Sequence, residues 1–393
     1  MNFCGVVCEF NPLHNGHKFL IEEAKKITNS NIICLMSGDF VQRGIPAIQT
    51  KQQRAKNAIN AGASVVLELP TIYACSNAEN FATGAIKIFK ALNIKQIAFG
   101  IEKTNLEILQ KIAKLKYENS QRFKTAFKNE IENGINYNTA LKRSISISLE
   151  DDNILEILNK PNNILAIEYL TAILKQNADI SPIAIERCDD GYESNIPQDK
   201  FLSASSIRDL IYQNKDFQKY LPYTINTEEI FDKSHQKIYE TLIILKLRTS
   251  KPEDLAKCYD YNEGIEYRIK EMADKYSSLE EIKQNISTPR YRIARVNKLL
   301  LYPLLNITKT IINSAKTTKP VSKVLAINKN NLELLKSYNK SKISLLTTNK
   351  EYERLSKKQK QIIDIDLNSS NIYNTIMGKK NNEDKKIGTI FLW

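Results

Sequence analysis

The sequence predicts an α/β fold in which a mainly parallel sheet is followed by a mainly helical, basic region and a small α/β part near residues 320–350. Up to about residue 215, short apolar runs alternate with amphipathic stretches, which is typical of βα units. Beyond residue 221 strand signals become rare, and most of the excess positive charge lies after residue 250. At about 100 to 200 residues per domain, the 393 residues indicate two domains, expected at 1–215 and 221–393.

Five strands are expected in the first domain, at 3–8, 31–36, 64–69, 96–100 and 182–186. Helices are expected at 17–27, 51–61 and 77–92, where apolar residues return every three or four positions. Right-handed crossovers between such elements give a doubly wound sheet. Ligands bind such sheets at the carboxyl ends of the strands, so the residues after each expected strand are the first place to look for a site.

In the second domain, helices are expected at 228–247, 252–259, 264–276 and 290–315. Two β-branched runs, 321–327 and 343–347, flank a helix-like stretch at 331–338, which indicates the small α/β part. The lysine-rich stretch 379–386 is expected to be a solvated, charged loop.

Positive charge is concentrated in the second domain. Residues 1–250 hold 30 basic and 28 acidic residues, whereas 251–393 hold 27 and 16, so 11 of the 13 excess charges lie there. Between residues 290 and 350 there are 13 Lys or Arg and one acid, Glu333. Such a cluster favours the binding of a polyanion such as nucleic acid. The alternative is a lysine-rich and asparagine-rich proteome, which would spread the charge evenly.

Several classes of protein are disfavoured by the sequence. No run approaches the roughly 18 apolar residues of a membrane span, and the first residues lack the charged region of a signal peptide, so we expect a cytoplasmic protein. The six cysteines are scattered without metal-ligand spacing and are expected to be buried thiols. Cys4 and Cys8 would lie about 13 Å apart along a strand, so no disulfide is expected between them.

The turn after the first expected strand carries Asn11-Pro12 and then His14-Asn15-Gly16-His17. Asn-Pro favours a turn, and a helix starts within the motif. Gly16 lets the backbone approach a phosphate closely, while the helix N-terminus supplies unpaired N–H groups and a positive dipole end. Two of the three histidines in the chain flank that position. The pattern therefore predicts phosphate binding, with the imidazoles stabilising a leaving pyrophosphate.

This turn resembles the HxGH signature of the nucleotidyltransferase superfamily, which also contains the class I aminoacyl-tRNA synthetases. The resemblance implies a Rossmann-like domain. The second signature of the superfamily, a Ser/Thr-rich turn before a helix with an arginine one turn in, has a counterpart in Ser203-Ala204-Ser205-Ser206-Ile207-Arg208. Its hydroxyls and amides would hold phosphate oxygens, with Arg208 as a charge-assisted donor. An ordinary helix cap explains the serines alone.

Four further segments narrow the resemblance. They are Glu9-Phe10-Asn11-Pro12-Leu13-His14-Asn15-Gly16-His17, Ser37-Gly38-Asp39-Phe40-Val41-Gln42-Arg43-Gly44, Leu67-Glu68-Leu69-Pro70 and Lys160-Pro161-Asn162-Asn163-Ile164-Leu165. Together with Thr288-Pro289-Arg290-Tyr291-Arg292-Ile293-Ala294-Arg295 they make the chain similar to the bacterial tRNA(Met) cytidine acetate ligases along almost its whole length. The chain departs from that family's pattern at Asp39, Ile101 and Pro289.

The resemblance implies an ATP-dependent ligase. ATP and acetate would give acetyl-adenylate and pyrophosphate, with Mg²⁺ bridging the phosphates, and the acetyl group would pass to N4 of the wobble cytidine of elongator tRNA(Met). His14, His17 and Arg208 would be catalytic, and no metal ligand in the chain is expected. The implied ATP contacts are Val7, Cys8, Glu9, Phe10, Asn11, Pro12, Leu13, His14, Asn15, Gly16, His17, Lys18, Phe19, Leu20, Gly100, Asn162 and Arg187.

Position along the chain supports three of these contacts independently. Gly100 and Arg187 follow expected strands, and Asn162 begins a helix after Pro161. The loop 37–44, with Asp39, Gln42 and Arg43, fits either the rim of the adenylate site or a purely structural loop.

A basic stripe is expected on the helix after Pro289, where the candidates for RNA phosphate contacts are Arg290, Arg292, Arg295 and Lys298. On that helix Ile293, Val296 and Leu300 would pack inward. Tyr291 and Tyr302 fit either base stacking or the hydrophobic core.

Two alternatives remain at this point. A small-molecule adenylyltransferase of the coenzyme-biosynthesis type shares the HxGH domain but has no need of the basic region. An RNA-binding protein with a vestigial nucleotide fold has no need of intact His14, Gly16 and His17. The ligase accounts for both features.

Overall fold

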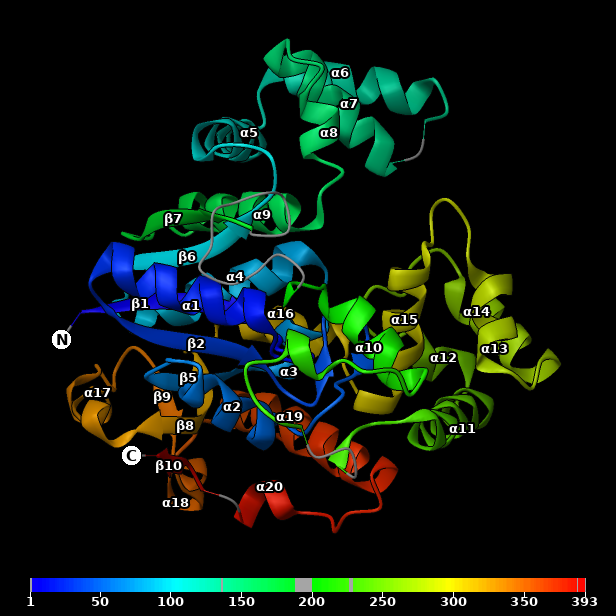
Figure 1. Ribbon diagram of the computed structural model, residues 1–393. Helices are drawn as coiled ribbons and strands as arrows, with labels where there is room; N and C mark the ends of the chain where they lie inside the picture. Colours follow the sequence, from blue (N-terminus) through cyan, green and yellow to red (C-terminus); the bar gives the residue numbers. More distant parts are fainter. Residues whose placement is uncertain (1, 136, 188–199, 226–228, 387, 393) are drawn as a thin grey trace.

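The computed structural model describes residues 2–135, 137–187, 200–225, 229–386 and 388–392 (Figure 1). A central sheet of eight strands has the order β10-β8-β5-β2-β1-β6-β7, with β9 paired to β8. Pairings are parallel except that of β5 with β8. The strands of this sheet are β1 (Phe3–Cys8), β2 (Asn31–Ser37), β5 (Val65–Leu69), β6 (Gln96–Ile101), β7 (Ser181–Glu186), β8 (Val321–Asn328), β9 (Ser344–Leu346) and β10 (Ile390–Leu392).

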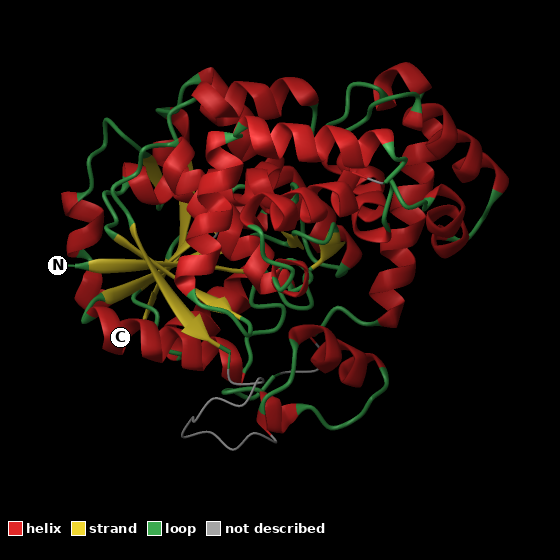
Figure 2. Cartoon of the chain, turned by 90° about the horizontal axis from the view of Figure 1, so that it is seen from above, coloured by secondary structure: helices red, strands yellow, loops and turns green. Residues whose placement is uncertain are grey.

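Both faces of the sheet are covered, which explains why its central strands are mostly apolar. Along β2, Ile32, Cys34 and Met36 pack with one core cluster, whereas Ile33 and Leu35 pack with the other, as the alternation of side chains in a strand requires. Helices α1 (Asn15–Thr28) and α2 (Lys51–Asn60) contact one face, and α4 (Ala78–Ala91) and α9 (Pro161–Lys175) lie on the other. Figure 2 shows the strands gathered on one side of the molecule. The α/β prediction is confirmed.

Further helices surround this frame. Before residue 215 in the sequence these helices are α3 (Thr71–Ala74), α5 (Leu106–Glu118), α6 (Gln121–Glu132), α7 (Tyr137–Leu149), α8 (Ile154–Ile157) and α10 (Ala204–Tyr212). After residue 230 they are α11 (Lys233–Thr249), α12 (Pro252–Leu255), α13 (Ile265–Lys275), α14 (Leu279–Ile286), α15 (Ile293–Leu305), α16 (Lys309–Thr317), α17 (Glu333–Ser337), α18 (Asn349–Glu353), α19 (Lys357–Ile376) and α20 (Glu383–Lys386). Short 3-10 turns lie at Gln218–Tyr220 and Lys329–Asn331. In Figure 1, α6, α7 and α8 project away from the sheet.

The small α/β part near 320–350 forms, and it belongs to the central sheet. Its strand β8 pairs antiparallel with β5, and β10 then pairs with β8. The helical region shares a core with the sheet as well, because Ile243, Ile269 and Val296 join the same cluster as Leu67 and Phe99. The two regions therefore fold against each other.

Two sequence expectations are wrong in this region. The single helix expected at 290–315 is broken into α15 and α16, because Asn306 adopts a left-handed conformation (φ 57°) after Pro303, and Thr308 caps the next helix. The stretch 379–386 is not simply a solvated loop: Asp384 is buried and its carboxylate lies 3.0 Å from Lys51 Nζ and 2.6 Å from Lys323 Nζ.

Cys4, Cys8, Cys34, Cys75 and Cys258 are free and buried, as expected. Cys188 lies outside the described residues. No helix in the described ranges has the length and apolar character to cross a membrane.

Candidate functional site

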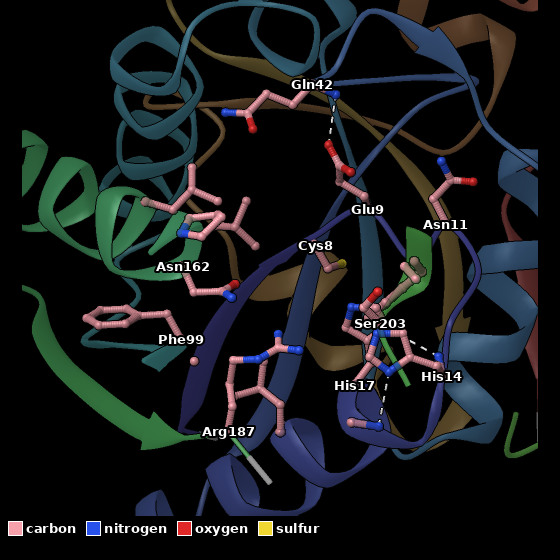
Figure 3. A pocket seen from close by; sticks show the side chains of 18 of the residues that line it. Cys8, Glu9, Asn11, His14, His17, Gln42, Phe99, Asn162, Arg187 and Ser203 are labelled. Atoms are coloured by element: carbon pink, nitrogen blue, oxygen red, sulfur yellow. Dashed lines mark hydrogen bonds between the residues drawn. The ribbon is translucent and has the colours of Figure 1, made fainter. Parts of the chain in front are cut away.

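A cleft of about 610 Å³ lies at the carboxyl ends of β1, β6 and β7, as expected for this kind of sheet (Figure 3). Most of the candidate residues line it. They are Val7, Cys8, Glu9, Phe10, Asn11, His14, Gly16, His17, Phe19, Leu20, Gly100, Asn162, Arg187 and Arg208.

The remaining ATP candidates do not line the cleft and have structural contacts. The Asn15 amide donates to the carbonyls of Lys200 and Lys219, at 3.0 Å each. Lys18 pairs with Glu22 on the surface of α1, at 3.6 Å. Leu13 is fully buried, and Pro12 follows a cis peptide bond.

The two histidines of the motif form one unit at the start of α1. His14 is the N-cap residue, and its Nδ1 accepts the Gly16 N–H at 3.1 Å. His17 Nδ1 accepts the His14 N–H at 3.3 Å, and the two rings lie 3.7 Å apart. Because both Nδ1 atoms are acceptors, each neutral ring carries its proton on Nε2. The motif therefore presents two Nε2–H donors in the cleft that both side chains line.

Burial keeps these rings neutral. Burial and, to a lesser extent, the positive charge of Arg187 lower the pKa of His14 to about 3. The pKa of His17 is also well below its usual value, owing to burial, His14 and Arg187. Hydrogen bonds from these rings, rather than their charge, would thus stabilise phosphate oxygens, while positive charge is supplied by arginines.

Three arginines line the cleft. Arg187 follows β7, Arg208 lies one turn into α10, and Arg43 is at the tip of a hairpin formed by β3 (Phe40–Val41) and β4 (Ile45–Pro46). Arg208 Nη1 donates to the carbonyl of Asn11 at 2.6 Å, so it is held against the HxGH turn. These cations would favour an anionic ligand at this end of the cleft.

The serine turn before Arg208 caps α10. Ser203 Oγ accepts the Ser206 N–H at 3.2 Å and lies within 3.0 Å of the hydroxyls of Ser205 and Ser206. Ser203 and Ser205 line the cleft. The turn therefore has both roles considered from sequence, a helix cap and a row of hydroxyls in the cleft.

The opposite end of the cleft is built around Glu102, which sequence analysis did not select. The Asn162 amide donates to its carboxylate, and Asn163 exchanges two hydrogen bonds with its backbone, at 2.9 and 2.8 Å. Nearby, a Cβ at Gly100 would lie 3.3 Å from Arg187 Cγ, so glycine keeps this passage open. Glu102 lies two residues beyond the end of an expected strand, a position that signals a ligand site.

Other lining residues lacked a sequence signal. Phe99 and Tyr169 form an aromatic wall with ring centroids 5.8 Å apart, and Leu165 lies beside them on α9. Tyr169 and Leu165 are in the middle of a helix, where apolar residues usually mark the core. Only the tertiary arrangement places them in the cleft.

The loop 37–44 divides into two roles. Gln42 and Arg43 line the cleft, whereas Asp39 is buried and accepts hydrogen bonds from Lys51 N–H at 3.1 Å and the Ser370 hydroxyl at 2.7 Å. Arg54, also fully buried, supports the loop: its guanidinium donates to the carbonyls of Glu9, Ser37, Gly38 and Gln49. Its signal in the sequence was a charge on the apolar side of an amphipathic helix.

The RNA candidates lie outside the cleft, at the start of α15. Arg290 pairs with Glu263, and Arg295 forms two hydrogen bonds with Asp260, at 2.7 and 2.8 Å. Arg292 is exposed, and Lys298 is half-buried, with Nζ 3.4 Å from the Ser76 carbonyl.

Around these residues, the expected packing is partly confirmed. Val296 and Leu300 are buried, but Ile293, the first residue of α15, is 46% exposed, so its expected inward packing is wrong. Tyr291 and Tyr302 are buried core aromatics.

Known proteins resemble this chain along nearly its whole length. The HIGH Nucleotidyl Transferase family matches residues 1–387. The chain is 32% identical over 390 residues to the tRNA(Met) cytidine acetate ligase of Clostridium perfringens and 35% identical over 387 residues to that of Thermoanaerobacter sp. strain X514, covering 95% of each chain in both cases. A crystal structure of Thermotoga maritima TmcAL bound with alpha-thio ATP matches with a TM-score of 0.89 and 26% identity, over 100% of both chains.

Proposed function

Because the chain belongs to the tRNA(Met) cytidine acetate ligase family of HIGH nucleotidyl transferases, we propose that it is an ATP-dependent ligase that acetylates N4 of the wobble cytidine of elongator tRNA(Met). It activates acetate as acetyl-adenylate, releases pyrophosphate, and passes the acetyl group to the RNA. Such an enzyme works in the cytoplasm, where its tRNA is.

The observation that carries this proposal is the pair of neutral imidazoles at the N-terminus of α1. Two Nε2–H donors beside a helix N-terminus suit an α-phosphate that gains charge as acetate attacks it. Arg187 and Arg208 line the same cleft and supply the positive charge that a leaving pyrophosphate needs. Acetate is already a nucleophile, so the step depends on alignment and charge stabilisation rather than on a base. Within this scheme His14, His17 and Arg208 are the catalytic residues.

ATP lies in the cleft between the HxGH turn and Glu102. We assign the triphosphate to the histidine and arginine end, and the nucleoside to the end formed by Gly100, Asn162 and the aromatic wall. Among the described residues no group of three or more His, Cys, Asp or Glu side chains could hold a metal ion. Mg²⁺ would therefore arrive on the phosphates, as it commonly does with nucleotides, and neutralise part of their charge.

RNA reaches the cleft from the helical side. The β3–β4 hairpin carries Arg43 into the cleft, and its Gly44 packs against the backbone of Lys298 in α15. The exposed Arg292 at the start of the same helix is the best placed of the four candidates to contact a phosphate, because Arg290 and Arg295 are paired with acids. A small-molecule adenylyltransferase would use neither feature and is not favoured.

The test is pyrophosphate release from ATP and Mg²⁺ with labelled acetate, with and without tRNA. We expect acetate-dependent release and label in the tRNA, and a loss of about 10²–10³-fold in His17→Ala. His235→Ala is the control, because His235 lies on α11 outside the cleft. Release that ignores acetate and tRNA would instead indicate the small-molecule enzyme.

A further inference from the structure

Glu9 places a carboxylate in a cleft that is also lined by Arg43, Arg187 and Arg208. It follows β1 directly, and its side chain points into the cavity (Figure 3). A carboxylate there repels phosphate, so phosphate binding does not account for it. The group that it faces must be a cation or a hydrogen-bond donor.

Two of the surrounding cations are committed elsewhere. Arg54 donates to four backbone carbonyls, and Arg208 donates to the Asn11 carbonyl. Glu9 Oε1 accepts the backbone N–H of Gln42 at 2.7 Å. This bond fixes the carboxylate beside the β3–β4 hairpin, which is the side from which RNA would enter.

Gln42 lies next to Glu9 at the mouth of the cleft, with its side chain directed over the cavity (Figure 3). A carboxylate and a primary amide together match the Watson–Crick edge of cytosine. The exocyclic N4 amine donates to a carboxylate, and N3 and O2 accept from an amide NH₂. Uracil has an acceptor where cytosine has N4, so the same pair would reject it.

We propose that Glu9 and Gln42 form the acceptor subsite for the target cytosine, with Glu9 as the base that takes the N4 proton during acetyl transfer. This inference rests on the proposed function and adds a residue to its second step. In that step N4 attacks the acetyl carbonyl carbon, the new N–C bond forms, and the bond from that carbon to the AMP oxygen breaks. AMP leaves with the bonding electron pair, and one N4 proton passes to the Glu9 carboxylate.

The environment suits this role. Burial raises the pKa of Glu9, while the Gln42 N–H and the nearby Arg208, Arg43 and Arg54 oppose that rise. A base whose pKa is brought toward the working pH transfers protons more effectively. Glu9 also lies one residue from the end of β1 and five before His14, so the HxGH turn and the base are built on one strand-to-helix segment.

The experiment separates the two steps in the full-length protein. Acetate-dependent ATP–pyrophosphate exchange measures adenylate formation, and labelled acetate in tRNA measures transfer. Glu9→Gln retains an oxygen to accept the Gln42 N–H but loses the base. We expect transfer to fall about 10²–10⁴-fold and exchange, which does not need the base, to fall far less. Glu22→Gln, the same change on the exposed side of α1, is the matched control.

Gln42→Ala tests the subsite independently of the base. We expect the KM for tRNA to rise about 10-fold or more, with exchange unchanged.

Three results would overturn the inference. They are transfer by Glu9→Gln within 3-fold of the unmodified protein, equal losses of exchange and transfer, which would indicate a role with ATP or Mg²⁺, and an unchanged KM in Gln42→Ala. If Glu9→Gln fails to fold, the KM of Gln42→Ala for tRNA tests the subsite. Failure of the proposed function looks different, because the unmodified protein would then show neither acetate-dependent exchange nor label in tRNA.

Discussion

At the residue scale, His14 combines a structural and a chemical role in one side chain. Its Nδ1 caps α1, and its Nε2–H is available in the cleft. The cap needs the neutral ring, because protonation of Nδ1 would remove the cap acceptor. The pKa of about 3, lowered by burial and by Arg187, therefore preserves the turn at neutral pH.

This pKa predicts a loss of stability in acid. The unfolded chain protonates His14 below about pH 6.5 and the folded chain does not until about pH 3. The unfolded state therefore binds more protons between these values, and folding stability falls as the pH is lowered through that window. From pH 7 to pH 5 we expect His14 to account for about 2 kcal/mol of the loss.

Urea unfolding of His14→Asn at both pH values measures this contribution. Asparagine is itself a good N-cap, so the variant should be close to the unmodified protein at pH 7. Between pH 7 and pH 5 its free energy of unfolding should fall by about 2 kcal/mol less than that of the unmodified protein. Equal losses in the two proteins would contradict a neutral, buried His14.

At the element scale, the β3–β4 hairpin connects the cleft to the helical region. Gly44 has a φ of +72°, and a Cβ there would lie 2.8 Å from the Lys298 backbone nitrogen. The Tyr239 hydroxyl donates to the Gly44 carbonyl at 3.3 Å. Contacts from α15 and α11 thus hold the hairpin tip, and with it Gln42 and Arg43.

Gly44→Ala is therefore expected to move the hairpin. The positive φ costs about 1 kcal/mol for alanine, and the contact with Lys298 adds to that cost. We expect transfer to tRNA to fall more than ATP–pyrophosphate exchange. Gly134→Ala is the matched control, since its φ is +77° and no atom lies within 4 Å of an added Cβ. Similar effects of the two changes on transfer would mean that the contact with α15 is unimportant.

Sequence could predict the elements whose signals are local. The strand expected at 3–8 and the helix expected at 51–61 correspond to β1 and α2, because apolar spacing and turn residues define them directly. The HxGH turn could be placed at the ligand-binding edge of the sheet because it directly follows an expected strand. Two-residue strands such as β3 and β4 carry no periodic signal, and the break after Pro303 depends on the left-handed Asn306. Tyr169 became a site residue only through long-range packing, whereas Glu102 had a signal in its position after an expected strand.

At the scale of the whole molecule, a buried charge cluster joins the N-terminal part of the sheet to the C-terminal segment around Asp384. Lys51, at the start of α2, lies 2.8 Å from Glu68 and 3.0 Å from Asp384. Burial alone would lower the pKa of Lys51, but Asp384, Glu68 and Asp39 raise it well above its ordinary value. Asp39 in turn anchors the base of the loop that carries Gln42. The last residues of the chain thereby support the cleft.

Removal of the Asp384 carboxylate measures the contribution of this cluster to the free energy of unfolding. In Asp384→Ala the buried Lys51 and the half-buried Lys323 lose a shared counter-ion, while Lys51 keeps Glu68. Breaking a buried pair costs up to about 3–5 kcal/mol. Glu383→Ala, one residue earlier and less buried, should cost well under 1 kcal/mol. Denaturant unfolding measures both values. The double change Lys323→Met with Asp384→Ala should recover part of the loss, because it removes the Lys323 charge that has lost its counter-ion. If the double variant is no more stable than Asp384→Ala, the ion pair does not determine the stability of this junction.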